Sequence, residues 1–136
     1  MKRQLFSSLF AMLSVVTFAQ TPATTNINMA GYPRIMPDHS IQFSIKAPEA
    51  QKVQIDLGRK YDMIRSADGV WSVTTEPQGS GIHYYSLVVD GLSVADPSSE
   101  SFFGCSRMMS CVEVPYANDD TRFEVRDVAH GSVRTV

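Results

Sequence analysis

The segment from Gly69 to Pro97 constrains the fold more than any other part of the chain. It alternates short apolar runs with turn residues, a pattern typical of consecutive strands. Asp90-Gly91 supplies the positive-φ pair that favours a tight hairpin, and Asp96-Pro97 ends the pairing. The predicted strands in this segment are 69–76, 82–89 and 92–95. The segment contains no metal-ligand cluster and no phosphate-binding loop, which favours binding over chemistry.

The rest of the chain continues the two-residue period. Ile41, Phe43 and Ile45 alternate with polar residues, and no apolar repeat of helical spacing is present. Phe102-Phe103-Gly104 is interpreted as an aromatic corner. The further predicted strands are 41–47, 53–57, 61–65 and 111–114. About seven short strands at this spacing predict an all-β, two-sheet sandwich.

The predicted strand 82–89 is apolar on both faces. Tyr84 and Val88 lie on one face, and Tyr85 and Leu87 lie on the other. Such a strand is either central in its sheet or covered by a second body. Because Tyr84 and Tyr85 point in opposite directions, at most one of them belongs to the core.

The first nineteen residues have the pattern of a signal peptide. Lys2 and Arg3 precede an apolar run that ends at Thr17-Phe18-Ala19, and this run is short for a bilayer span, the alternative being a membrane anchor. We therefore expect a secreted or periplasmic protein with no membrane association after cleavage. The predicted organisation is a signal peptide at 1–19, a flexible leader at 20–30, the sandwich at 31–115 and a linker at 116–136.

Charge excludes one class of partner. The chain has 12 basic and 14 acidic side chains, and loss of Lys2 and Arg3 leaves 10 against 14, a net charge of −4. This weak acidity provides no electrostatic footprint for nucleic acid or an anionic membrane. Neutral glycans are compatible with it.

Four segments in order carry a resemblance to a known family: APEAQKVQIDLG, DGVWSV, GIHYYSLVVDG and ADP. Together they resemble the family 48 carbohydrate-binding modules, which are immunoglobulin-like early-set domains. The continuation DPSSESFFGCSRMMSCVEVP is similar to the N-terminal module of secreted bacterial feruloyl or acetyl-xylan type esterases. The resemblance implies an early-set sandwich, a glycan partner that is xylan-like or an α-glucan, and a C-terminal esterase domain.

The chain departs from these relatives at two points. Glycogen-binding members stack two tryptophans on sugar rings, whereas this chain has Ser93 after the hairpin turn and only Tyr61 upstream. Esterases of the family need a nucleophile elbow, G-x-S-x-G, and the sequence contains none. We therefore interpret the chain as a non-catalytic fragment of a carbohydrate esterase, with no cofactor.

The candidate carbohydrate-binding residues are Tyr61, Trp71 and Tyr85. Trp71 alternates with Ser72 and shares a face with Val73, so packing in the core or rim is the alternative to a glycan contact. The histidines are scattered without ligand spacing, which does not indicate a metal site.

Cys105 and Cys111 are the only cysteines. Export would permit a disulfide between them, and the alternative is two free thiols with Cα atoms too far apart to bridge.

Phe102 and Phe103 are the candidate residues for docking to a catalytic domain. If these residues and the doubly apolar strand exceed what one sandwich can bury, they form an apolar patch that a following domain would cover. Two interpretations remain open: a module that positions an esterase on plant glycan, and a spacer without affinity for sugar.

Overall fold

A computed structural model describes residues 20–116, 127, 129 and 131–135. The described residues form strands and connecting turns, and none of them lies in a helix. The strands are β1 (Thr21–Pro22), β2 (Arg34–Ile35), β3 (Ile41–Lys46), β4 (Val53–Asp56), β5 (Lys60–Asp62), β6 (Ile64–Arg65), β7 (Val70–Thr74), β8 (Gly81–Val89), β9 (Leu92–Val94), β10 (Ser101–Gly104) and β11 (Arg107–Val114).

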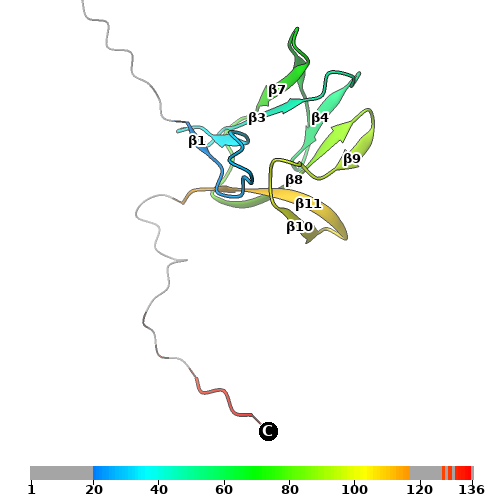
Figure 1. Cartoon of the computed structure of the whole chain (residues 1–136). Coiled ribbons are helices and arrows are strands. Elements are labelled where there is room, and N and C mark those ends of the chain that lie inside the picture. The colour runs from blue at the N-terminus through cyan, green and yellow to red at the C-terminus, as the bar shows by residue number, and fades with distance from the viewer. Residues whose placement is uncertain (1–19, 117–126, 128, 130, 136) are drawn as a thin grey trace, which may run out of the picture.

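The strands form two antiparallel sheets that face one another (Figure 1). One sheet has the order β1-β2-β3-β7-β6, and the other has the order β10-β11-β8-β4-β5, with β9 paired to the far end of β8. The chain changes sheet at buried Met63, so the single strand expected at 61–65 is divided into β5 and β6. The predicted all-β sandwich is confirmed.

The core lies between the sheets and follows the period-two pattern of the sequence. Phe43 from one sheet meets Tyr85 from the other edge to face, with ring centroids 4.9 Å apart. Their neighbours at the same parity are buried aliphatic residues, which include Ile41, Val53, Ile55, Leu87, Val112 and Val114. Alternating side chains on paired strands therefore build one continuous apolar layer.

Strand β8 is a central strand of its sheet, which is one of the two positions expected for a strand that is apolar on both faces. It pairs with β11 through its first half and with β4 and β9 through its second half. Tyr85 and Leu87 face the core, while Ile82 and Tyr84 on the outer face are 62% and 42% exposed. The opposite outcome for adjacent tyrosines follows directly from strand parity.

The predicted flexible leader at 20–30 is wrong. Within it, β1 pairs with β2, Ala23 is buried, and Asn26 forms a β-bridge with Ser99. The Thr25 hydroxyl donates to the carbonyl oxygen of Cys111 at 2.7 Å. Strand β10 pairs with β11 only as far as Ser110, so the free edge beyond it needs other partners, and the leader supplies them.

The predicted aromatic corner at 102–104 is also corrected, because it is strand β10 of a hairpin with β11. The hairpin turns at Cys105 and Ser106, whose φ angles are 51° and 63°. Strand β11 therefore begins at Arg107 rather than at Cys111. Two consecutive positive φ angles are characteristic of tight hairpin turns, which usually carry Gly or Asn at these positions, so the sequence did not mark this turn.

From the sequence, two segments are expected at the ends of the chain, outside the sandwich. The predicted signal peptide at 1–19 lies outside the described residues, and so does much of the predicted linker at 116–136. No helix in the described part of the chain is long and apolar enough to cross a bilayer.

Candidate functional site

Trp71 is a core residue. Its side chain faces inward beside Ile45, its register partner on β3, and the residue is only 6% exposed. The indole N–H donates to the carbonyl oxygen of Ala47 at 2.9 Å. The packing alternative therefore holds for Trp71, and its ring is not available as a sugar platform.

Tyr85 is fully buried, which contradicts its selection as an exposed glycan contact. Its hydroxyl donates to the Oδ2 atom of Asp96 at 2.8 Å, and the Oδ1 atom of Asp96 accepts from the backbone N–H of Ser98. Burial, reinforced by the nearby carboxylate, raises the pKa of Tyr85 far above its ordinary value. Tyr85 thus fixes the connection from β9 to β10 instead of binding a ligand.

Tyr61 is half-buried on edge strand β5, and its ring already has partners. Ile55 is its register neighbour in the core, and the Arg59 guanidinium lies 4.6 Å from the ring centroid. The Tyr61 hydroxyl donates to the Oε1 atom of Glu76 at 2.7 Å, and Arg59 forms an ion pair with the same carboxylate. The pKa of Glu76 is lowered mainly by the hydrogen bond from Tyr61, and the contact with Arg59 lowers it further. Of the three candidate residues, only Tyr61 reaches the surface, and the structure does not bring them together as one platform.

The β10–β11 hairpin exposes an apolar pair that we name the hairpin pair, Phe103 and Met108. They are direct register partners and are 77% and 53% exposed. Phe102 lies on the other face of the hairpin, where it is half-buried beside buried Met109. Phe103 thus remains a candidate docking residue, whereas Phe102 packs partly within the domain. Sequence reasoning missed Met108. The signal was the adjacent pair Met108-Met109, which pairs with Phe103 and Phe102 across the hairpin, so that one methionine lies on each face.

The hairpin leans over the outer face of β8, and this explains why the two faces of the hairpin differ in exposure. A Cβ atom on Gly104 would lie 3.1 Å from the Cε1 atom of Tyr84. Arg107 reaches across β8 to Asp56, with Nη2 and Oδ2 3.8 Å apart. Gly104 therefore lies on the face that is turned toward the sheet, and the hairpin pair, at the opposite parity, is turned away from it.

Exposed large apolar side chains are concentrated on one part of the sandwich. Among the described residues in strands, Ile64 of β6 is the one such residue outside β8–β11. Those within β8–β11 are Ile82, Tyr84, Leu92, Val94, Phe103 and Met108. Most of the large exposed apolar side chains in the described strands therefore lie in one of the two sheets.

The candidate disulfide between Cys105 and Cys111 is not formed. Cys105 is an exposed free thiol in the hairpin turn, and Cys111 is a buried free thiol within β11. Cys105 lies in the turn before β11, and the four residue steps from Arg107 to Cys111 extend about 13 Å along the strand at the usual rise, which places the two cysteines beyond the reach of a disulfide. Burial raises the pKa of Cys111, so its thiol is held in the neutral form.

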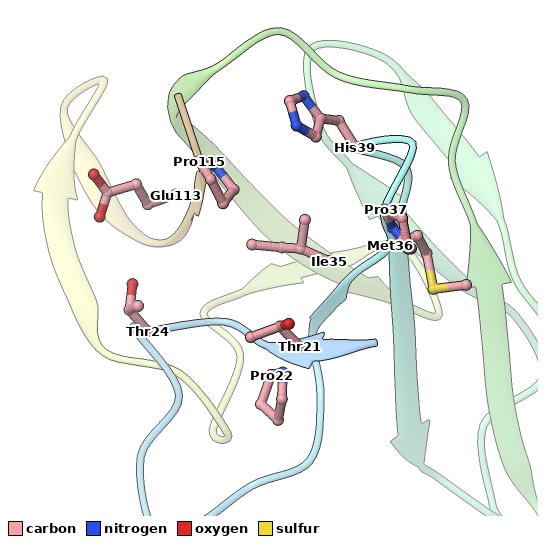
Figure 2. A pocket seen from close by; sticks show the side chains of 9 residues that line it. All are labelled: Thr21, Pro22, Thr24, Ile35, Met36, Pro37, His39, Glu113 and Pro115. Atoms are coloured by element: carbon pink, nitrogen blue, oxygen red, sulfur yellow. The ribbon is translucent and has the colours of Figure 1, made fainter. Parts of the chain in front are cut away.

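A pocket opens at the margin of the sandwich, between β1 and the end of β11 (Figure 2). Its volume is about 260 Å³, and buried Ile35 lies at its centre. The lining residues are Thr21, Pro22, Thr24, Ile35, Met36, Pro37, His39, Glu113 and Pro115. We refer to it as the β1–β11 pocket. Within the part of the chain that the structure describes, no three acidic, His or Cys side chains are grouped as metal ligands.

These observations define a two-sheet β-sandwich domain with an apolar hairpin pair and a pocket at its margin. The chain is 34% identical over 110 residues to an endo-1,4-beta-xylanase/feruloyl esterase of Xylanibacter ruminicola. That match spans 77% of this chain and 15% of the relative, so the chain corresponds to a small part of a larger carbohydrate-active enzyme. No protein-family model matches the chain.

Two solved structures with similar segments are both much larger proteins. An α-amylase-like protein of Salmonella typhimurium is 28% identical, with a TM-score of 0.47 over 54% of this chain and 13% of that one. PulA from Klebsiella pneumoniae is 23% identical, with a TM-score of 0.46 over 62% of this chain and 10% of that one. The two-sheet sandwich is defined by the strand pairings of this chain.

Proposed function

We propose that this chain is a non-catalytic accessory module, similar to family 48 modules, of an exported esterase that acts on plant polysaccharide. Its first role is to dock to the catalytic domain through the hairpin pair, Phe103 and Met108. The module thereby helps to position the enzyme on xylan-like or other glycan. The similarity to one part of a xylanase/feruloyl esterase supports this context, and the sequence lacks a nucleophile elbow of its own.

One observation carries the proposal: apart from Ile64, the large exposed apolar side chains of the described strands lie on β8–β11, and Phe103 and Met108 among them are register partners. Phe103 and Met108 lie in a paired hairpin whose opposite face includes buried Met109, so their exposure is not the result of a frayed end. Removing both from water would contribute on the order of 3 kcal/mol, enough to hold two tethered domains together. The occupant is a catalytic domain, since the matched relative consists mostly of sequence outside the aligned region.

A spacer without affinity for sugar is the second candidate function. It is favoured because none of the three predicted platform residues presents a free ring to a sugar. Trp71 and Tyr85 are buried, and Arg59 lies over the ring of Tyr61. Affinity electrophoresis on xylan, starch and glycogen separates the two functions. Retardation on any of these gels supports glycan positioning, and unchanged mobility on all three leaves docking as the sole role.

Docking is tested in a chimera in which this chain replaces the matched segment of the Xylanibacter ruminicola enzyme. Tethering gives a high local concentration, so a weak contact becomes measurable. We expect the esterase part of the chimera to unfold at a higher temperature than the esterase part alone. We further expect Phe103→Ser combined with Met108→Ser to remove this gain.

Ile64→Ser is the matched control, because Ile64 is as exposed as Phe103 but lies on the other sheet. It should leave the gain intact. The isolated chain with both hairpin substitutions should keep its own unfolding midpoint, since neither side chain packs within the domain. If the wild-type chimera shows no gain, or if the double variant retains it, docking through this hairpin is refuted.

A further inference from the structure

The β1–β11 pocket has the size of a single ring. Figure 2 shows Ile35 at its centre, with Pro115 on one side and Thr21 on the other. Its volume is about 260 Å³, whereas a dry protein cavity of about 150 Å³ holds benzene. The pocket therefore has room for one six-membered ring with a small substituent.

The lining of the pocket favours an aromatic ring over a sugar ring. Its walls are mainly apolar, formed by Ile35 and the prolines at 22, 37 and 115. A pyranose carries hydroxyl groups around its whole circumference, and each one buried without a partner is costly. An aryl ring with a single hydroxyl requires polar groups at only one place.

Apart from Thr21, whose hydroxyl lies beside Ile35, the polar side chains of the pocket lie toward its rim. Thr24 and Glu113 lie on the same side, and His39 lies at another part of the rim (Figure 2). Among the described residues, the side chains of these three residues have no hydrogen-bond partner. A carboxylate that accepts from a phenol hydroxyl forms a charge-assisted hydrogen bond, which is stronger than a bond between neutral groups.

We propose that the β1–β11 pocket binds a monocyclic phenol, with the ring on Ile35 and the prolines and the hydroxyl donated to Glu113. This inference deepens the proposed function and rests on it for the source of the ligand. A feruloyl group ends in a methoxyphenol ring, so such a group carried on the glycan is the ligand class. The module would then recognise the decoration on the polysaccharide in place of its sugar backbone.

The test is an NMR titration of the full chain with 2-methoxyphenol, methoxybenzene and methyl β-xyloside as probes. We expect 2-methoxyphenol to give saturable amide shifts confined to the pocket, with a Kd on the order of 1 mM for so small a ligand. Methoxybenzene, which lacks the hydroxyl, should bind at least about fivefold more weakly. The xyloside should give no saturable shifts.

Variants locate the binding. Thr24→Phe and Thr21→Phe each fill the pocket from an exposed position and should abolish the shifts. Glu113→Gln should weaken 2-methoxyphenol binding about fivefold, whereas Glu49→Gln, an exposed glutamate far from the lining, should not change it.

Three outcomes would overturn the inference: xyloside binding as tight as that of the phenol, full binding by both filled variants, or unaltered binding by Glu113→Gln. None of these affects the chimera experiment, which involves no pocket residue. Failure of phenol binding with docking preserved would therefore refute this inference alone.

Discussion

At the scale of single residues, face parity decides the role of each aromatic side chain. Tyr84 and Tyr85 are adjacent and chemically identical, yet one packs over Gly104 at the surface and the other is hydrogen-bonded to Asp96 in the core. The sequence predicted their opposite directions but not which direction was inward, because both faces of the strand are apolar. The answer came from the sheet that lies opposite, where Phe43 meets Tyr85.

The two cysteines give a prediction at this scale. In the native, unreduced protein we expect Cys105 to react with a thiol reagent within seconds to minutes, because it is exposed in the hairpin turn. Cys111 should react only after unfolding, since it is buried and burial raises its pKa, which leaves little reactive thiolate. Mass spectrometry before and after addition of urea counts the labels.

Single variants provide the controls for this measurement. Cys105→Ser should abolish labelling of the native protein, and Cys111→Ser should abolish only the label that appears after unfolding. Absence of any label in unreduced denaturant would mean that the two sulfurs are bridged, contrary to the structure.

At the scale of elements, the N-terminal segment 20–30 is a structural part of the sandwich. Its sequence is rich in Thr, Ala and Pro and has no periodicity, which is why it resembled a flexible leader. The hydrogen bonds that order it come from residues distant in sequence, such as Cys111 and Ser99. Local pattern cannot reveal such partners.

A matched pair of substitutions tests this element. Thr25→Ala removes the hydroxyl that donates to the Cys111 carbonyl and should lower the free energy of unfolding by about 1 kcal/mol. Thr24→Ala, one residue away, has no such bond to lose and should stay within about 0.5 kcal/mol of wild type. Urea unfolding followed by fluorescence of Trp71 measures both. Equal stability of the two variants would show that the leader does not contribute to the fold.

At the scale of the whole molecule, stability depends on pH at both extremes. Four surface carboxylates accept hydrogen bonds or ion pairs that lower their pKa values, and they are Asp38, Asp62, Asp68 and Glu76. A lowered pKa in the folded state contributes stability above the unfolded value, and this is lost as pH falls. Tyr85 has the opposite sign, because its raised pKa contributes stability below pH 10.0 that is lost as pH rises.

We therefore predict a plateau of stability from about pH 5 to pH 9, with a decline on each side. The acid decline begins near the ordinary carboxyl values of 3.8 for aspartate and 4.5 for glutamate. Urea unfolding at a series of pH values measures the profile. In Tyr85→Phe, which has no phenol to ionise, the alkaline decline should become shallower. A stability that rises below pH 4 would contradict the assignment of the carboxylates.

Much of this protein was determined by its sequence alone, because strand periodicity and hairpin chemistry are local properties. The alternation at 41–45, the apolar strand 82–89 and the Asp90-Gly91 turn were sufficient for an all-β sandwich. The tertiary structure alone decided that Tyr85 rather than Tyr84 enters the core, that the β10–β11 hairpin exposes Phe103 and Met108, and that a pocket lies between β1 and β11. These features depend on contacts between segments far apart in the chain, and no local pattern encodes which distant surface will cover a given side chain.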